Sequence, residues 1–199
     1  DFWEYDPSLD SWTELSFPGF GRGPGVGFSI GSKGYFGTGN GGSSIDRPDY
    51  PNQDFWEYDP SNNSWTQLSA IPMRKCGAIG FSISGKGYIG SGWDYIPPGA
   101  IGLSVSKDFW EYDPSLDTWS QVADYPGAAM YHGLGISTPA KGYVGTGYNG
   151  TESKDLYEYD QVLNSWTQKA NFGAIGRFGS VAFAIGSKMG KCTPMISAG

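Results

Sequence analysis

The sequence predicts an all-β protein built from repeated four-stranded antiparallel sheets. The first observation behind this prediction is a motif, Asp-Phe-Trp-Glu-Tyr-Asp-Pro, which begins at Asp1, Asp54 and Asp108 and returns in a weaker form at Asp155. The second is a Trp that follows each copy at the same distance: Trp12, Trp65, Trp119 and Trp166. The copies start about fifty residues apart, which is the spacing of a repeat architecture.

The composition excludes several other classes of protein. The 32 Gly residues follow no Gly-X-Y period, which excludes collagen, and 16% aromatic residues argue against a disordered linker. A formal net charge of −7 disfavours nucleic acid or an anionic membrane as partner. We expect no membrane insertion, because no apolar run reaches eighteen residues. The two cysteines, Cys76 and Cys192, are too few for a disulfide framework and lack a metal-ligand pattern.

One repeat shows the expected strands in order. Residues 26–30 alternate apolar with small residues, as a strand with one buried face does. Gly31-Ser32 supplies a short turn, and residues 33–39 form the second predicted strand. The third predicted strand covers residues 55–58. After a turn rich in Asp, Pro and Asn, the fourth covers residues 65–68.

Four short antiparallel strands joined by tight turns make one twisted sheet, the blade of a β-propeller. The same first and second strands recur at 79–83 and 86–92, and again at 134–136 and 141–147. The glycines in these strands fit a propeller, because inner strands crowd around the axis and a side chain there would clash.

The order of these features resembles the kelch repeat: an apolar strand, Gly-x-Gly, a spacer, (Phe/Leu)-(Trp/Tyr)-x-Tyr-Asp, and then a Trp. It is similar to the blades of the galactose oxidase central domain and of bacterial surface kelch proteins. The resemblance covers nearly the whole chain, from Asp1 to about Ser187. One departure is that Gly37-Thr38-Gly39, or its equivalent, replaces the usual Gly-Gly pair. The resemblance implies a kelch-type β-propeller.

The repeats also predict where the blades begin and end. We expect a propeller over residues 1–187, with complete blades at about 24–69, 77–123 and 131–170, half-blades at 1–16 and 178–187, and an off-pattern tail at 188–199. The chain opens in mid-repeat without an initiator Met, so we interpret it as a mature product or a fragment. Kelch-like propellers usually have more blades, which favours part of a larger ring; closure of the two half-blades into a ring of four is the alternative. For the tail, a premature end, a shifted reading frame and a native C-terminus all stay open.

Candidate binding residues lie in the long loops. In an up-and-down blade, the loop between the second and third strands lies on the same face as the connection to the next blade, and the other face carries tight turns. Variable loops on a rigid scaffold usually hold binding residues, and aromatic residues beside carboxylates suit sugar or peptide recognition. The candidates are Asp46, Arg47, Asp49, Tyr50, Trp93, Asp94, Tyr95, Tyr148, Asn149 and Arg177. The alternative is that these aromatic residues pack the loops and blade edges.

Other recurring residues point to structure. The aromatic residues of the third and fourth strands stand at identical positions in each repeat, so we expect them to pack blade against blade. Glu4, Glu57, Glu111 and Glu158 also recur. Our hypothesis for these is an ion pair with Arg22, Arg74, Lys75 or Arg177.

We predict no catalytic residue, metal or cofactor in this chain. The resemblance to galactose oxidase suggests the active site of a copper-radical oxidase. Such a site needs two His, two Tyr and a Tyr–Cys link, and the chain has one His, His132. A serine triad would need the same His, and no Gly-x-Ser-x-Gly motif accompanies it. Asp46 and Asp49 could serve a glycosidase, but loop carboxylates are usually solvated. We assign Gly37-Thr38-Gly39 to a strand and not to a nucleotide-binding loop.

The sequence therefore predicts a non-catalytic binding module that presents loops on one propeller face to a protein or glycan. A location outside the cytoplasm or at the cell surface follows from the resemblance to bacterial surface kelch proteins. One alternative is part of a carbohydrate-active enzyme, galactose oxidase-like or a glycosidase, whose catalytic residues lie outside this chain. Another is an intracellular, cytoplasmic kelch adaptor that binds a peptide.

Overall fold

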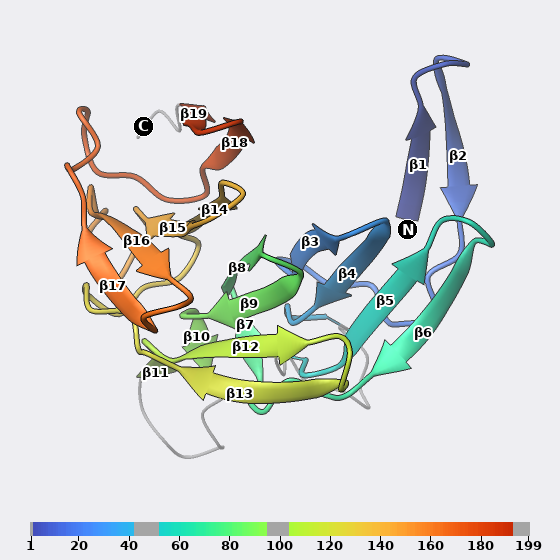
Figure 1. The fold of residues 1–199 in the computed structure, drawn as a ribbon, viewed down its shortest axis with the longest axis horizontal. Helices are drawn as coiled ribbons and strands as arrows, with labels where there is room; N and C mark the ends of the chain where they lie inside the picture. The colour runs from blue at the N-terminus through green and yellow to red at the C-terminus, as the bar shows by residue number, and fades with distance from the viewer. Residues whose placement is uncertain (1, 42–51, 95–103, 193–199) are drawn as a thin grey trace.

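The computed structural model describes residues 2–41, 52–94 and 104–192. These residues form strands, turns and irregular segments, with no helix among them. The strands gather into separate antiparallel sheets that follow one another along an open arc (Figure 1). In the described part of the chain there is no helix with the length and apolar character needed to span a membrane.

Three of the sheets are complete four-stranded blades in which each strand pairs with the next one of the blade. Blade 1 contains β3 (Val26–Ile30), β4 (Lys33–Gly37), β5 (Phe55–Asp59) and β6 (Ser64–Leu68). Blade 2 contains β8 (Ile79–Ile83), β9 (Lys86–Gly90), β12 (Phe109–Asp113) and β13 (Thr118–Val122). Blade 3 contains β14 (Leu134–Ser137), β15 (Gly142–Gly145), β16 (Leu156–Asp160) and β17 (Ser165–Gln168). The predicted all-β fold of four-stranded antiparallel blades is confirmed.

The remaining sheets are smaller. The N-terminal hairpin pairs β1 (Phe2–Asp6) with β2 (Ser11–Leu15), and the C-terminal hairpin pairs β18 (Val181–Ile185) with β19 (Lys188–Cys192). The two hairpins stand at opposite ends of the arc (Figure 1). β19 lies in the segment that departs from the repeat pattern, so the chain still forms a second strand there. A short three-stranded sheet joins β7 (Lys75–Cys76), β10 (Trp93–Asp94) and β11 (Ser104–Val105).

The second strand of blade 1 ends two residues earlier than predicted. Thr38 and Gly39 have φ angles of 60° and 86°, in the left-handed region, and such a backbone cannot continue a β ladder. The assignment of Gly37-Thr38-Gly39 to a strand was therefore wrong beyond Gly37. The turn has a structural use, because the amide of Gly39 donates a 2.9 Å hydrogen bond to the carbonyl of Lys75, which precedes blade 2. The later blades repeat this bond, from Gly92 to Met130 and from Gly147 to Arg177.

The prediction that the repeated aromatic residues pack blade against blade is confirmed. The ring of Phe55 in blade 1 lies 4.9 Å from that of Tyr112 and 5.0 Å from that of Trp119, both in blade 2. Between blades 2 and 3, Phe109 contacts Trp166 in the same way, at 5.2 Å. Edge-to-face contacts at these distances are favourable beyond the burial of apolar area. The cores of the molecule are thus the interfaces between blades.

Hydrogen bonds to the backbone fix how far one blade turns against the next. The indole of Trp119 donates to the carbonyl of Ser69 at 2.9 Å, and the carboxylate of Asp117 accepts from the Ser69 amide at 2.9 Å. Trp166 and Asn164 make the same two contacts with Ala123. An amide and a carbonyl at the end of one blade therefore both bond side chains of the next blade.

Replacing Asp117 by Ala should destabilise the interface between blades 1 and 2. The Ser69 amide and the Tyr112 hydroxyl would lose their acceptor. Because the exposed amide can bond water instead, we expect a loss of about 0.5–1.5 kcal/mol in the free energy of unfolding, the net value of a hydrogen bond. Urea unfolding followed by Trp fluorescence measures this cost. Asp117→Asn is the control, because Asn164 fills the same place in blade 3. Equal stability of Asp117→Ala and the native chain would contradict the assignment.

Candidate binding face

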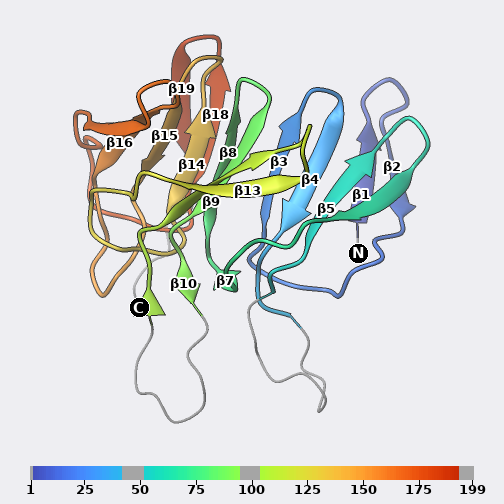
Figure 2. The same cartoon turned by 60° about the horizontal axis from the view of Figure 1, so that its bottom comes forward.

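The connections between blades and the loops between second and third strands lie on one side of the arc, which we name the loop face (Figure 2). β7 belongs to the connection between blades 1 and 2, and it pairs with β10 of the neighbouring loop. Single bridges join the equivalent segments elsewhere, between Gly23 and Asn40 and between Tyr131 and Tyr148. The prediction that both sets of loops share a face is confirmed, and the backbone pairs them.

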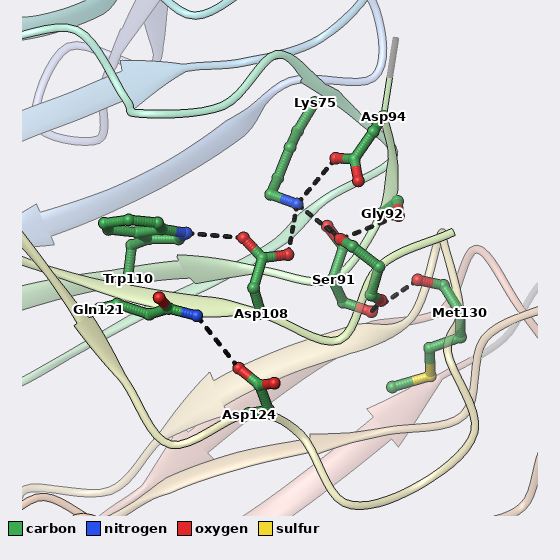
Figure 3. A network of polar contacts seen from close by, with 10 residues as sticks. Lys75, Ser91, Gly92, Asp94, Asp108, Trp110, Gln121, Asp124 and Met130 are labelled. Atoms are coloured by element: carbon green, nitrogen blue, oxygen red, sulfur yellow. Dashed lines mark hydrogen bonds and ion pairs between the residues drawn. The ribbon is translucent and has the colours of Figure 1, made fainter. Parts of the chain in front are cut away.

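A fully buried lysine holds the loop face to blade 2. The ammonium of Lys75 lies 2.7 Å from a carboxylate oxygen of Asp108, 3.0 Å from one of Asp94 and 2.6 Å from the hydroxyl of Ser106 (Figure 3). The other oxygen of Asp108 accepts from the indole of Trp110 at 2.6 Å. Three donors of one cation meet three oxygens, so the buried charge is paired and hydrogen-bonded, as burial of a charge demands.

The pKa values of the two carboxyl groups, Asp108 and Asp94, shift in opposite directions. Burial alone would raise the pKa of Asp108, but the charge and hydrogen bond of Lys75 outweigh it and lower the pKa. For Asp94 burial prevails over the attraction of Lys75, and the nearby Asp108 adds to it, so its pKa is raised. Asp108 is thus the main counter-ion of Lys75.

The same arrangement recurs in blade 1 and is lost in blade 3. Arg22 pairs with Asp54, which also accepts from the indole of Trp56 at 2.7 Å. In blade 3, Met130 and Tyr157 stand at the repeat positions of the basic residue and the Trp. The third blade therefore replaces a polar anchor by an apolar one.

The hypothesis on the recurring glutamates was wrong about Arg22 and Lys75, which pair with aspartates. Glu57 instead pairs with Lys33 at 2.5 Å and accepts from the Tyr35 hydroxyl at 2.7 Å. Glu111 makes the equivalent contacts with Lys86 and Tyr88. Glu158 keeps the contact with the tyrosine, Tyr143, but its cation is Lys169, which follows the fourth strand. In the three complete blades the glutamate binds residues of its own blade, and the ladder places the tyrosine of the second strand directly opposite it.

Aromatic side chains gather on the loop face where blade 3 meets the C-terminal hairpin. We name Tyr131, His132, Tyr148 and Phe178 the aromatic cluster. Tyr131 lies 5.7 Å from Tyr148 and 5.1 Å from His132, and Phe178 lies 5.3 Å from Tyr148 and 6.5 Å from His132, between ring centres. All four residues are half-buried, and the Nε2 atom of His132 is itself buried. Such rings can stack on a sugar or pack against a peptide side chain.

His132 is held by its backbone as well as its ring. Its amide donates to Gly77 at 2.8 Å and its carbonyl accepts from Gly179 at 2.9 Å, which links three successive repeats. Its φ is 53°, and Gly77 and Gly179 have similar angles of 60° and 63°. Burial lowers the pKa of His132, and its Nε2 has no hydrogen-bond partner among the described residues. In that part of the chain no group of three or more His, Cys, Asp or Glu could hold a metal ion.

Five of the predicted site residues, Asp46, Arg47, Asp49, Tyr50 and Tyr95, lie outside the described residues. The others lie on the loop face. Trp93 and Asp94 form β10, and the carboxylate of Asp94 forms a salt bridge with Lys75. Tyr148 is in the aromatic cluster, and Asn149 beside it is exposed.

Arg177 lies next to Tyr148, because its carbonyl accepts from the amide of Gly147. The guanidinium of Arg177 stands 4.6 Å from the ring centre of Phe172. The structure therefore brings Tyr148, Asn149 and Arg177 together, and places Trp93 and Asp94 at the neighbouring blade.

Three residues of the aromatic cluster were missed by sequence reasoning: Tyr131, His132 and Phe178. Tyr131 and Phe178 occupy the repeat position of Gly23 and Cys76, just before each first strand. An aromatic residue at a position held elsewhere by a small residue was the available signal.

Replacing Lys75 by Met should destabilise the protein by about 3–5 kcal/mol, because two partly buried carboxylates lose their cation. Chemical denaturation measures this loss. The triple variant Lys75→Met, Asp94→Asn, Asp108→Asn should recover part of it, since the uncompensated charges are gone. A native-like midpoint for Lys75→Met alone would refute the role of this ion pair.

His132 should make stability depend on pH between about pH 7 and 5. The pKa of His132 is lowered in the folded state, so the unfolded chain binds the proton first as pH falls. The stability that this neutral His contributes is therefore present above the unfolded pKa and is lost as pH falls toward the folded pKa. The chain has one His, so the difference between the native protein and His132→Asn isolates this part. Asn is chosen because it also tolerates positive φ. Parallel pH profiles of the two proteins would rule the effect out.

Comparison with known proteins identifies the fold. No protein-family model matches the chain. An F-box/kelch-repeat protein of Arabidopsis thaliana is 34% identical over 71 residues, which are 36% of this chain and 14% of that protein. The solved structure of YjhT superposes with a TM-score of 0.71 at 22% identity, over 87% of this chain and 62% of that one. The chain thus spans a small part of the first relative and less than two thirds of the second. With the blades described above, these matches confirm that the chain has the predicted kelch-type β-propeller fold.

Proposed function

We propose that the chain is a non-catalytic interaction module that binds a protein ligand on its loop face, with the aromatic cluster as the centre of contact. The observation that carries the proposal is that four half-buried aromatic side chains meet on the one face that also carries long loops. Large aromatic residues dominate the energy of protein interfaces.

The surroundings of the cluster support this proposal. The blades and the Lys75 and Arg22 ion pairs fix the described part of the loop face, so ordering that part on binding costs little entropy. The exposed Asn149 supplies a polar group at the rim, as interfaces commonly have. The kelch-repeat relative is consistent with a protein-interaction module.

A glycan ligand is the second candidate, because the same exposed rings could stack on a sugar. Activity as part of a carbohydrate-active enzyme is the rival from another class, and it would use residues outside this chain. Turnover of mono- and oligosaccharides by the purified chain, with and without copper, would overturn our choice. Location outside the cytoplasm stays a prediction, with a cytoplasmic adaptor as its alternative.

Selection of a random peptide library on the purified chain tests the proposal. We expect peptides whose affinity falls about tenfold or more when Tyr148 is replaced by Ala, as for a contact residue at an interface centre. Titration calorimetry with a selected peptide measures the change.

Leu116→Ala is the control, because it also truncates a large side chain to Ala, and Leu116 is 69% exposed in a tight turn on the opposite face. Peptides that lose affinity with Leu116→Ala and keep it with Tyr148→Ala would place binding elsewhere. A glycan array on which only Tyr148-dependent sugars bind would select the second candidate.

A further inference from the structure

Asparagine is followed by glycine at two places in the chain, at Asn40 and at Asn149. This dipeptide is chemically reactive, because glycine has no side chain to hinder the approach of its own amide nitrogen to the asparagine side chain. When that nitrogen bonds to Cγ of the asparagine, its proton leaves with the side-chain nitrogen as ammonia, and a cyclic imide forms. Water then opens the imide at one of its two carbonyls, which gives aspartate or isoaspartate.

Asn149 stands at the tip of the short loop of blade 3. A bridge between Tyr148 and Glu152 closes this loop, so that residues 149–151 lie beyond the last backbone pair, and all three are exposed. Gly150 has a φ of 109°, and no atom beyond its chain neighbours lies within 4 Å of where a Cβ would stand. The reacting groups of this pair are therefore uncovered and have room to move.

Asn40 occupies a bridge itself, at the repeat position of Tyr148. Its amide donates to the carbonyl of Gly23 at 2.8 Å, and its carbonyl accepts from the amide of Gly23 at 2.9 Å. The side-chain oxygen of Asn40 is buried. A Cβ on Gly41 would overlap the carbonyl oxygen of Gly21, so the chain is tightly packed here. Both residues of this pair are thus held in place.

The peptide group between the two residues decides whether the imide ring can close. The glycine nitrogen must turn toward Cγ, and the asparagine carbonyl turns with it because the peptide group is planar. At Asn40 that turn breaks the hydrogen bond from Gly23. At the other pair, no described residue donates to the carbonyl of Asn149 or accepts from the amide of Gly150. The hydrogen bonds of Asn149 are long contacts with Thr151, at 3.3 and 3.5 Å.

We propose that Asn149 is a site of spontaneous deamidation, which converts it through a cyclic imide into aspartate and isoaspartate, and that the bridge to Gly23 protects Asn40. The overall reaction consumes water and releases ammonia, and it needs neither an enzyme nor an oxidant. It should become faster as pH rises, because base removes the amide proton of Gly150.

The new carboxylate would stand at the edge of the aromatic cluster. Asn149 directly follows Tyr148 of that cluster, and Gly147 on the other side of Tyr148 is bonded to the carbonyl of Arg177. A negative charge at the rim of an interface favours a basic partner and makes its binding depend on salt. This consequence rests on the proposed function, whereas the modification itself does not.

Peptide mapping by mass spectrometry of the purified chain, incubated at mildly alkaline pH, tests the proposal. The tryptic peptide 142–154 contains Asn149 and no other asparagine, so exchange of an amide for an acid in this peptide reports the site. We expect steady conversion of Asn149 while Asn40 stays an amide. An unchanged Asn149 under conditions that convert it in the unfolded chain overturns the proposal.

The same chain unfolded in guanidinium chloride is the internal reference. There both pairs lose their structure and should react at similar rates. In the folded chain Asn40 must wait for local opening, so its rate should fall about tenfold or more, whereas that of Asn149 should stay within about threefold of the unfolded rate. Equal protection of the two sites would overturn the role of the bridge.

Hydroxylamine tests the intermediate, because it cleaves a chain at a cyclic imide. Treatment of the folded chain should release the fragments 1–149 and 150–199. Asn149→Gln is the control, since its longer side chain would have to close a larger ring, and these fragments should disappear. Cleavage after Asn40 in place of Asn149 would overturn the assignment.

Asn149→Asp tests the consequence for binding separately. Selected peptides that contain Lys or Arg should bind this variant about two- to fivefold more tightly than the native chain at low salt, as for a charge at an exposed rim. Equal affinities would overturn the effect on binding, while the deamidation is decided by the mapping alone.

Discussion

The fold depends on burying the aromatic residues of one blade against the next. A single four-stranded blade has two faces and no core of its own, so its stability comes from its neighbours. Phe55 shows the arrangement, because it is wholly buried although its contacts with Tyr112 and Trp119 come from another blade. Burial of such a side chain stabilises the folded state by about 1.5–3 kcal/mol, and the same contribution recurs at each interface between blades.

This packing forces polar groups into places that water does not reach, and the repeat satisfies them with a fixed set of side chains. Lys75 and Arg22 lie under the loop face with their charges paired to aspartates that open a third strand. At the exposed edge of the interface, Trp119 and Asp117 hydrogen-bond the backbone of Ser69. A buried pair of charges contributes modestly to stability but fixes one geometry strongly, since any other arrangement leaves a charge unpaired.

The aromatic cluster forms where blade 3 departs from this set. Met130, Tyr131 and His132 follow one another at the positions that hold Lys75, Cys76 and Gly77 one repeat earlier. The backbone stays the same, as the positive φ of His132 shows, while the two residues after the anchor position, Tyr131 and His132, belong to the aromatic cluster. A repeat protein can thus change its surface chemistry at one place without changing its scaffold.

Three features of the sequence determined the fold by themselves: the spacing of about fifty residues between repeats, the alternation of apolar and small residues within strands, and the recurring Trp and Tyr. These features act within a hairpin and return at the same positions in each repeat. The partners of Lys75, the early end of β4 at Gly37 and the meeting of His132 with Phe178 were decided by the tertiary structure. These features join residues of different strands or blades, and their distances depend on how each blade turns against the next. Glu57 illustrates the difference: its recurrence predicted a partner, but only the pairing of β4 with β5 placed Lys33 within reach.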